Sequence, residues 1–251
     1  MERSRLFWPV SAAAQAFSGF ADWPSIEDYD RAVGAGLPVA IREQPPRPKR
    51  RRGREREVIE VSGLYEGRIH LEGWLPTRPR SWHDFFNLLV WASFPRAKRQ
   101  LSARQAATLA QWVAPGVREL PGRRTREQDG LAILDEGGLL LLVEAGAAGE
   151  VREGLAGRAA GPVAEAIGAG RAVALLFGHA VYEQIARGGP PVRAMTEVLE
   201  VAGALPREAQ ARVALADARL HEVLEDPESF CRPETFRSLP VEEGVLLGGP
   251  G

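Results

Sequence analysis

The sequence predicts a helix-rich mixed α/β domain of the α+β kind, with a small and mostly antiparallel sheet. Long segments with helical spacing of apolar residues dominate the chain, and a few short segments rich in leucine or β-branched residues lie between them. A length of 251 residues with 45% hydrophobic content is enough for one sizeable core. We therefore expect one globular domain over residues 1–226, followed by an extended tail over 227–251.

The first part of the chain predicts short elements around a polar loop. Residues 23–33 (WPSIEDYDRAV) predict a short helix, and residues 37–41 (LPVAI) predict a short strand. Residues 42–57 are dense in proline and arginine and cannot form a packed element, so they predict a surface loop. Residues 58–74 carry β-branched residues at a spacing near two, which predicts two strands or one strand with a bulge.

The middle of the chain predicts the main helices and the centre of the sheet. Residues 81–113 predict a long helical region divided at Pro95. Residues 129–146 (DGLAILDEGGLLLLVEAG) contain two apolar runs joined by Gly-Gly, which predicts a buried β-hairpin. Residues 148–170 have a loose helical period, and residues 171–187 (RAVALLFGHAVYEQIAR) predict a stronger, mostly buried helix.

The last part of the chain predicts one more strand, one more helix and the tail. Apolar residues alternate over 191–201, which predicts a strand, although a helix fits nearly as well. Residues 206–226 predict an amphipathic helix with Pro206 in its first turn. From Pro227 onward the chain is rich in proline and glycine, so we expect it to lie extended over the body.

Charge, cysteine content and hydropathy limit the classes of function. The 32 Lys and Arg against 33 Asp and Glu give a net charge of -1, which favours neither nucleic acid nor acidic membranes as partners. Cys231 is the single cysteine, which excludes an internal disulfide and a cysteine-based zinc cluster. No apolar run approaches the roughly 20 residues that span a bilayer, and Pro9 interrupts the N-terminal apolar patch that a secretory signal would need. We expect a soluble, cytoplasmic protein without a membrane partner.

Polar side chains stand in the most apolar part of the chain, SWHDFFNLLVWASFPRAK (81–98). Ser81 and Asp84 fit a capping box, which gives Asp84 a structural explanation. His83 and Asn87 are four residues apart and share one face of the predicted helix. The rest of this helix is apolar, and each buried polar group without a partner costs on the order of 1 to 3 kcal/mol. We therefore predict specific partners for these two side chains.

A second predicted helix repeats the arrangement with His179 and Glu183, again four residues apart. Gly178, beside the histidine, costs about 1 kcal/mol of helix propensity, which indicates close approach of another backbone or of a ligand. The structural alternative is a buried histidine with its hydrogen bonds satisfied and Glu183 paired with Arg187.

Together the two helices offer side chains that suit a divalent metal (Zn, Fe or Mn) or metal-free acid-base chemistry. Asp135 and Glu136 would add carboxylates if the predicted hairpin tip folds over His83, although turn chemistry alone also explains them. The predicted metal ligands are His83, His179, Glu183 and Asp135. The predicted catalytic residues are His83, His179, Glu183 and Asp84.

Basic residues bracket the first polar helix and predict a small anionic substrate. Arg78, Arg96 and Lys98 would hold it, together with Asn87, although such residues are more commonly solvated or ion-paired. No Walker loop, dinucleotide glycine motif or Gly-x-Ser-x-Gly elbow is present, which disfavours nucleotide-cofactor and serine-hydrolase chemistry. The leading hypothesis is metal-assisted or His/carboxylate acid-base hydrolysis of a small anionic compound.

Two other classes of function stay open. In a non-catalytic binding or scaffold protein, the same polar groups would form a closed hydrogen-bond network that fixes helix packing. In a nucleic-acid-associated protein, the basic run 47–56 would contact phosphates. That run lacks interleaved aromatic residues, which favours a solvated loop and makes nucleic acid a weak candidate. The oligomeric state does not follow from the sequence.

Three blocks of the chain resemble the bacterial domain-of-unknown-function family 3025. They are YEGRIHLEGWLPTRPRSWHDFFNLLVWASFPRAK (65–98), QDGLAILDEGG (128–138) and LLFGHAVYE (175–183). The matching positions are Tyr65, Glu66, Arg68, Ile69, Thr77, Arg78, His83, Asp84, Asn87, Phe94, Pro95, Arg96, Lys98, Asp135, Glu136, Gly138, Gly178, His179, Ala180 and Glu183. The helix after Lys98 lacks the Asn that is usual in the family, and 205–251 lies outside the resemblance. Because the family has no assigned activity, the resemblance implies only that the two polar pairs belong to one motif set and meet in space.

Overall fold

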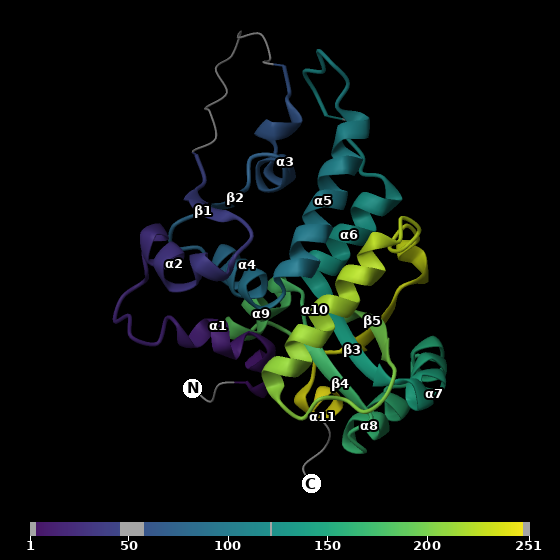
Figure 1. Ribbon diagram of the computed structural model, residues 1–251. Helices are drawn as coiled ribbons and strands as arrows, with labels where there is room; N and C mark the ends of the chain where they lie inside the picture. Colours follow the sequence, from purple (N-terminus) through teal and green to yellow (C-terminus); the bar gives the residue numbers. More distant parts are fainter. Residues whose placement is uncertain (1–3, 46–57, 121, 248–251) are drawn as a thin grey trace.

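A four-stranded sheet with the strand order β4-β3-β5-β6 forms the centre of the fold. The computed structural model describes residues 4–45, 58–120 and 122–247 (Figure 1). β3 (Gly138–Glu144) pairs antiparallel with β4 (Ala172–Leu176) and parallel with β5 (Arg193–Val201), and β5 pairs antiparallel with β6 (Arg237–Pro240). The predicted α+β class with a small, mostly antiparallel sheet is therefore confirmed.

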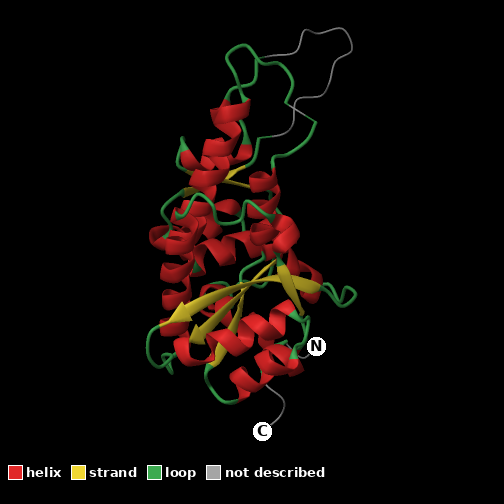
Figure 2. Ribbon diagram, turned by 90° about the vertical axis from the view of Figure 1, so that its right-hand side faces the viewer, coloured by secondary structure: helices red, strands yellow, loops and turns green. Residues whose placement is uncertain are grey.

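Helices cover both faces of this sheet, and further helices extend away from it (Figure 2). α7 (Ala145–Ala156) packs against β3 and β5, and α8 (Gly161–Gly168) packs against β4. α10 (Ala209–Glu225) lies along α5 (Pro95–Trp112). The leucines of β3 are completely buried, which explains why this strand is a continuous apolar run rather than an alternating one.

The N-terminal segment packs onto α4 (Trp82–Ser93) through aromatic rings. Phe17 and Tyr29 lie with their ring centroids 5.3 and 5.8 Å from that of Phe85, and Trp23 lies 4.7 Å from Trp82. Nearby, β1 (Ala40–Glu43) pairs in parallel with β2 (Trp74–Thr77).

The remaining elements are η1 (Arg5–Val10), α1 (Ser11–Gln15), α2 (Ile26–Val33), η2 (Gly34–Gly36), η3 (Val61–Gly63), α3 (Tyr65–His70), α6 (Arg126–Gly137), α9 (His179–Ala186), η4 (Pro233–Thr235) and α11 (Glu243–Leu246).

Several predicted elements lie where the sequence places them. The helical region divides at Pro95 into α4 and α5, and Pro95 is the first residue of the second helix. α2 lies within the predicted helix 23–33, and α10 lies within 206–226. The strand β5 occupies Arg193–Val201 of the segment 191–201, so the helical alternative is excluded.

The predicted hairpin over 129–146 is wrong, because its first half is the helix α6. Thr125 and Gln128 form a capping box that begins this helix. Leu131 and Leu134, three residues apart, share a helix face and are completely buried. The Gly-Gly pair thus ends a helix and leads into β3 rather than forming a hairpin turn.

The predicted single helix over 171–187 is also wrong, because β4 and α9 divide it. Phe177 N and Gly178 N both donate to Gly138 O, which ends β4 and turns the chain. A Cβ atom on Gly178 would lie 2.5 Å from Gly138 N and 2.6 Å from Glu136 O. The predicted close approach of another backbone at Gly178 is therefore confirmed.

Two further segments differ from expectation. Residues 58–73 contain η3 and α3 rather than strands, and β2 begins only at Trp74. Gly67 allows η3 and α3 to pack closely, because a Cβ there would lie 1.8 Å from Val61 O. The expected extended tail instead contains β6 and α11 and contributes buried side chains such as Leu239 and Leu246 to the core. The basic run 47–56 lies outside the described residues. Within the described ranges, none of the helices has the length and apolar character needed to cross a membrane.

Candidate functional site

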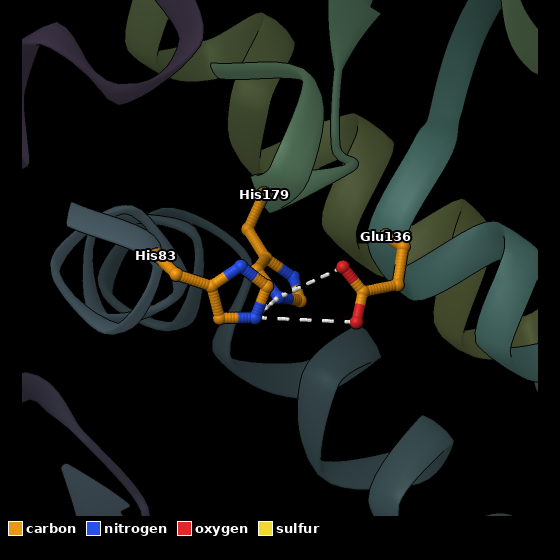
Figure 3. Close-up of side chains that lie close together, drawn as sticks. All are labelled: His83, Glu136 and His179. Carbon is orange, nitrogen blue, oxygen red and sulfur yellow. Dashed lines mark hydrogen bonds and ion pairs between the residues drawn. The ribbon is translucent and has the colours of Figure 1, made fainter. Parts of the chain in front are cut away.

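Two helix N-termini bring the predicted histidines into contact (Figure 3). His83 is the second residue of α4, after the N-cap Ser81, and His179 is the first residue of α9, after the N-cap Gly178. Their Nε2 atoms are 3.0 Å apart, and the two rings meet edge to face at 72°. Residues 96 positions apart in sequence are therefore joined in one site.

The other ring nitrogen of each histidine has a hydrogen-bond acceptor as its partner. His179 Nδ1 lies 2.8 Å from the backbone oxygen of Asp135, and a carbonyl oxygen can only accept. His83 Nδ1 lies 3.3 Å from Glu183 Oε2. Burial lowers the pKa of His179 to about 4, so this imidazole is neutral at pH 7, with its proton on Nδ1 and a lone pair on Nε2.

Glu136 completes a group of three possible metal ligands with the two histidines. It lies in the last turn of α6, with Oε2 3.5 Å from His179 Nε2 and Oε1 4.0 Å from His83 Nε2. Each of the three residues can place one ligand atom within 4.8 Å of the others. Burial raises the pKa of Glu136, although 52% of its side chain remains exposed. The Glu136 side of the group therefore borders solvent.

Asp135 contacts Lys98 and the Nδ1 atom of His179 rather than the paired Nε2 atoms. Its carboxylate accepts a hydrogen bond from Lys98 Nζ, and its backbone oxygen orients His179. Burial acts to raise the pKa of Asp135, but the charge and the hydrogen bond of Lys98, with smaller contributions from the histidine side chains, outweigh it and lower the pKa. Asp135 is thus an ionised partner for Lys98.

Lys98 lies inside the protein, with only 3% of its side chain exposed. Its Nζ donates to Asp135 and also, at 2.8 Å, to Asn87 Oδ1. Asn87 Nδ2 in turn donates to the hydroxyl of Tyr65 at 3.0 Å. Trp91 lies beside the ammonium group, 5.5 Å from ring centroid to Nζ, as in a cation-π contact. Asn87 therefore has specific hydrogen-bond partners, as predicted, and they are Lys98 and Tyr65.

Asp84 and Arg78 form an ion pair at the edge of the site. Asp84 accepts from Arg78 N, Nε and Nη2 at 2.6, 2.8 and 2.7 Å. Ser81 caps the Asp84 amide at 3.3 Å, but the Asp84 carboxylate binds Arg78 instead of completing the predicted capping box. The side chain of Arg78 stays 55% exposed. The predicted pair of Glu183 and Arg187 also forms, at 3.0 Å.

The structure separates Arg96 from the other predicted site residues. Its backbone nitrogen donates to Asp217 Oδ2 on α10 at 3.2 Å, and its charge lowers the pKa of Asp217, against the larger effect of burial. Because Arg96 and Lys98 are about 200° apart around α5, they face different neighbours. The predicted residues that hydrogen bonds connect to the histidine pair are Glu183, Asp135, Lys98 and Asn87. Asp84 and Arg78 bind each other, and Asp84 follows His83 in α4.

Sequence reasoning left Glu136 out of the ligand set and gave Tyr65 no role. Glu136 stands next to Asp135, and the only signal for it was the DEGG motif in which both occur. Tyr65 belongs to the motif set of the resemblance but stands in a segment that predicts strands. Neither side chain can be assigned until α6 and α3 are known to be helices.

The fold and the site together define a helix-rich α+β protein with two histidines in contact, one of them buried, and an adjacent carboxylate. The chain belongs to the family described as protein of unknown function (DUF3025), whose model matches residues 54–246. This match confirms the family resemblance and extends it to the β6 and α11 segment. No curated protein and no solved structure matches the chain.

Proposed function

We propose that the protein binds one divalent metal ion through His83, His179 and Glu136 and hydrolyses a small anionic compound there. The observation that carries the proposal is the contact of the two Nε2 atoms at 3.0 Å. Both Nδ1 atoms face acceptors, so the lone pairs of both Nε2 atoms converge on the same space when the rings are neutral. Two lone pairs this close repel unless a cation, either a metal ion or a proton, lies between them.

The donor set fits zinc, iron or manganese. Two imidazoles and one carboxylate are a common ligand set for these metals, with positions left for water or substrate. Metal-nitrogen bonds of about 2.1 Å place two ligand nitrogens about 3.0 Å apart at a right angle and about 3.4 Å apart at the tetrahedral angle. The observed 3.0 Å lies within reach of both geometries. Asp135 and Glu183 bind the opposite ring nitrogens, as groups behind metal-binding histidines commonly do.

The local charge balance also supports a cation. Three carboxylates near the histidines each have a basic partner, in the pairs Asp84–Arg78, Asp135–Lys98 and Glu183–Arg187. In the described part of the chain, the close ion contacts of Glu136 are with the two imidazoles. A divalent ion would balance Glu136 and offset the cost of holding its negative charge in a partly buried place.

Hydrolysis follows from what such a site supplies. A bound divalent metal lowers the pKa of its water to about 7 and polarises a carbonyl or phosphoryl oxygen. Arg78 and Arg187 would attract the anionic group of the substrate, since their side chains are 55% and 67% exposed. Each of them has N–H donors beyond those used on its carboxylate.

The test is the metal content of protein purified without a histidine tag, together with titration of the metal-free protein with Zn²⁺, Fe²⁺ and Mn²⁺. We expect close to one equivalent in the parent, and loss of binding in Glu136→Gln and in the double variant His83→Ala, His179→Ala. His221→Ala is the matched control, because His221 contacts Glu225 on α10 and should leave the metal content unchanged.

Circular dichroism of each variant separates the metal site from a structural network. A folded Glu136→Gln protein that keeps its metal would refute the ligand set. A parent that binds none of the three ions, with a double variant that unfolds, would favour the non-catalytic network of hydrogen bonds.

A further inference from the structure

We infer that the Tyr65 hydroxyl is the hydrogen-bond donor that this site presents to a substrate oxyanion, and that Asp135, Lys98 and Asn87 position it. The inference rests on the proposed function, since it takes one substrate oxygen to be bound by the metal and another by Tyr65. It narrows the substrate to compounds in which an oxygen beside the reacting centre carries or develops negative charge.

The hydrogen bonds that connect Asp135, Lys98, Asn87 and Tyr65 each have a direction that the chemistry of their donor and acceptor groups fixes. An ionised carboxylate only accepts and an ammonium group only donates, so Lys98 donates to Asp135 and to Asn87 Oδ1. The orientation of the Asn87 amide is thereby settled, with its oxygen toward Lys98 and its nitrogen toward Tyr65. The Tyr65 oxygen must accept from Asn87, and it cannot donate back.

The hydroxyl proton of Tyr65 is consequently available to a ligand. Within the described residues, the bond from Asn87 is the single hydrogen bond recorded for this hydroxyl. Burial raises the pKa of Tyr65, and the negative charges of Asp135, Asp84 and Glu66 raise it further, so the proton stays in place at neutral pH. The residue as a whole is 38% exposed, so Tyr65 borders solvent, although its hydroxyl is enclosed enough for burial to raise its pKa.

The position of Tyr65 relative to the histidines fits a single substrate. Asn87 follows His83 by one turn of α4, a rise of about 6 Å along the helix axis. Asp135 belongs to both parts of the site, because its backbone oxygen orients His179 while its carboxylate begins the chain to Tyr65. A small oxyanion could therefore bind the metal with one oxygen and accept from Tyr65 with another.

Inorganic phosphate is the probe, and the visible absorption of cobalt(II) bound in place of the native metal reports its binding without any assay of activity. We expect phosphate to change the cobalt spectrum of the parent and Tyr65→Phe to weaken phosphate binding about tenfold or more. Tyr29→Phe is the matched control, because it removes a hydroxyl that binds Trp23 outside the site. The cobalt affinity should be equal in all three proteins.

Asn87→Asp tests the positioning role with almost no change of shape. An aspartate would still accept from Lys98 but would also accept from Tyr65, so the Tyr65 proton would turn away from the substrate. We expect phosphate binding to weaken in Asn87→Asp, and to weaken no further when Asn87→Asp is added to Tyr65→Phe. If the added negative charge acted only by repelling phosphate, the two effects would add, and the positioning role would be refuted.

The possible failures are distinguishable. Unchanged phosphate affinity in Tyr65→Phe, or no response of the parent cobalt spectrum to phosphate, overturns the inference and leaves the metal site standing. Absence of cobalt binding in the parent overturns the proposed function. Phosphate binding is then measured by calorimetry on the metal-free protein, where the same comparison of parent and Tyr65→Phe decides whether Tyr65 is an oxyanion donor.

Discussion

Gly178→Ala should disturb the site through a single methyl group. A Cβ at this position would lie 2.5 Å from Gly138 N and 2.6 Å from both Glu136 O and Gly137 Cα. All three neighbours are backbone atoms at the junction of α6 and β3, so no flexible side chain can move aside. The backbone conformation of Gly178 is ordinary, with φ at -63°, so the effect is steric rather than torsional.

The magnitude follows from this overlap of nearly 1 Å with ordinary contact distances at three atoms. Overpacking a core costs about 1 to 3 kcal/mol, and contact with rigid backbone places Gly178→Ala at the upper end. For a chain of this length, about 3 kcal/mol corresponds to a fall in Tm of about 6 to 12 °C. His179 follows directly in the chain, so its displacement from Asp135 should also weaken metal binding by about tenfold or more.

Thermal denaturation followed by circular dichroism, with metal titration of the same samples, measures both effects. Gly137→Ala is the matched control, because a Cβ on the neighbouring Gly137 would meet no atom within 4 Å. That control should keep the Tm of the parent or raise it slightly, since alanine favours the end of α6 over glycine. A Gly178→Ala protein with the Tm and metal affinity of the parent would refute the close approach of the two backbones.

Three further predictions concern stability away from the histidines. Burial raises the pKa of the folded-state Glu197 carboxyl to about 7, whereas the carboxyl ionises near 4.5 in the unfolded chain. Its contribution to the free energy of unfolding is therefore complete below pH 4.5 and is lost as the pH rises through 7. Glu197→Gln should flatten this pH dependence of the free energy of unfolding. Arg104 donates to the backbone oxygens of Asp226, Pro227 and Ser229. A lysine cannot form these several hydrogen bonds at once, so Arg104→Lys should lower the free energy of unfolding by about 3 kcal/mol and expose the segment after α10 to proteolysis. Arg126→Lys, on the surface, should change the free energy of unfolding by less than about 0.5 kcal/mol. Asp217 accepts from the Arg96 and Ala97 amides at the start of α5; Asp217→Ala should cost about 1 to 2 kcal/mol in urea denaturation, and equal midpoints for variant and parent would exclude this capping role.

Features set by local sequence could be predicted, and those set by distant packing could not. Pro95 divides two helices because its ring blocks helix continuation, which is a property of the residue itself. The segment 171–176 has the same apolar composition as a buried helix, and it becomes β4 because β3 offers it a ladder. The pairing partners lie 29 to 37 residues earlier in the chain, so no local spacing reveals them.

The choice of metal ligands depended on whether Asp135 and Glu136 lie in a hairpin turn or in a helix. In a hairpin turn, Asp135 and Glu136 would both point outward near the tip, and either would serve as a ligand. In α6 consecutive side chains diverge by about 100°, so Asp135 turns toward Lys98 while Glu136 turns toward the paired Nε2 atoms. The spacing of His83 to Asn87 and of His179 to Glu183 could be interpreted correctly because it holds within one helix each. Glu136, the carboxylate beside both histidines, could be identified only once the fold was known.

The burial of Lys98 changes the role that can be assigned to it. As a cation beside a polar helix, it predicts direct contact with an anionic substrate. With 3% of its side chain exposed and Asp135 and Asn87 as partners, its charge is already balanced inside the protein. What it can still determine is direction, because an ammonium group fixes the orientation of the Asn87 amide and leaves the Tyr65 proton for a ligand. In the proposed site, the exposed Arg78 and Arg187 would attract the anion, and the buried lysine would set the direction of the hydrogen bond that the anion accepts from Tyr65.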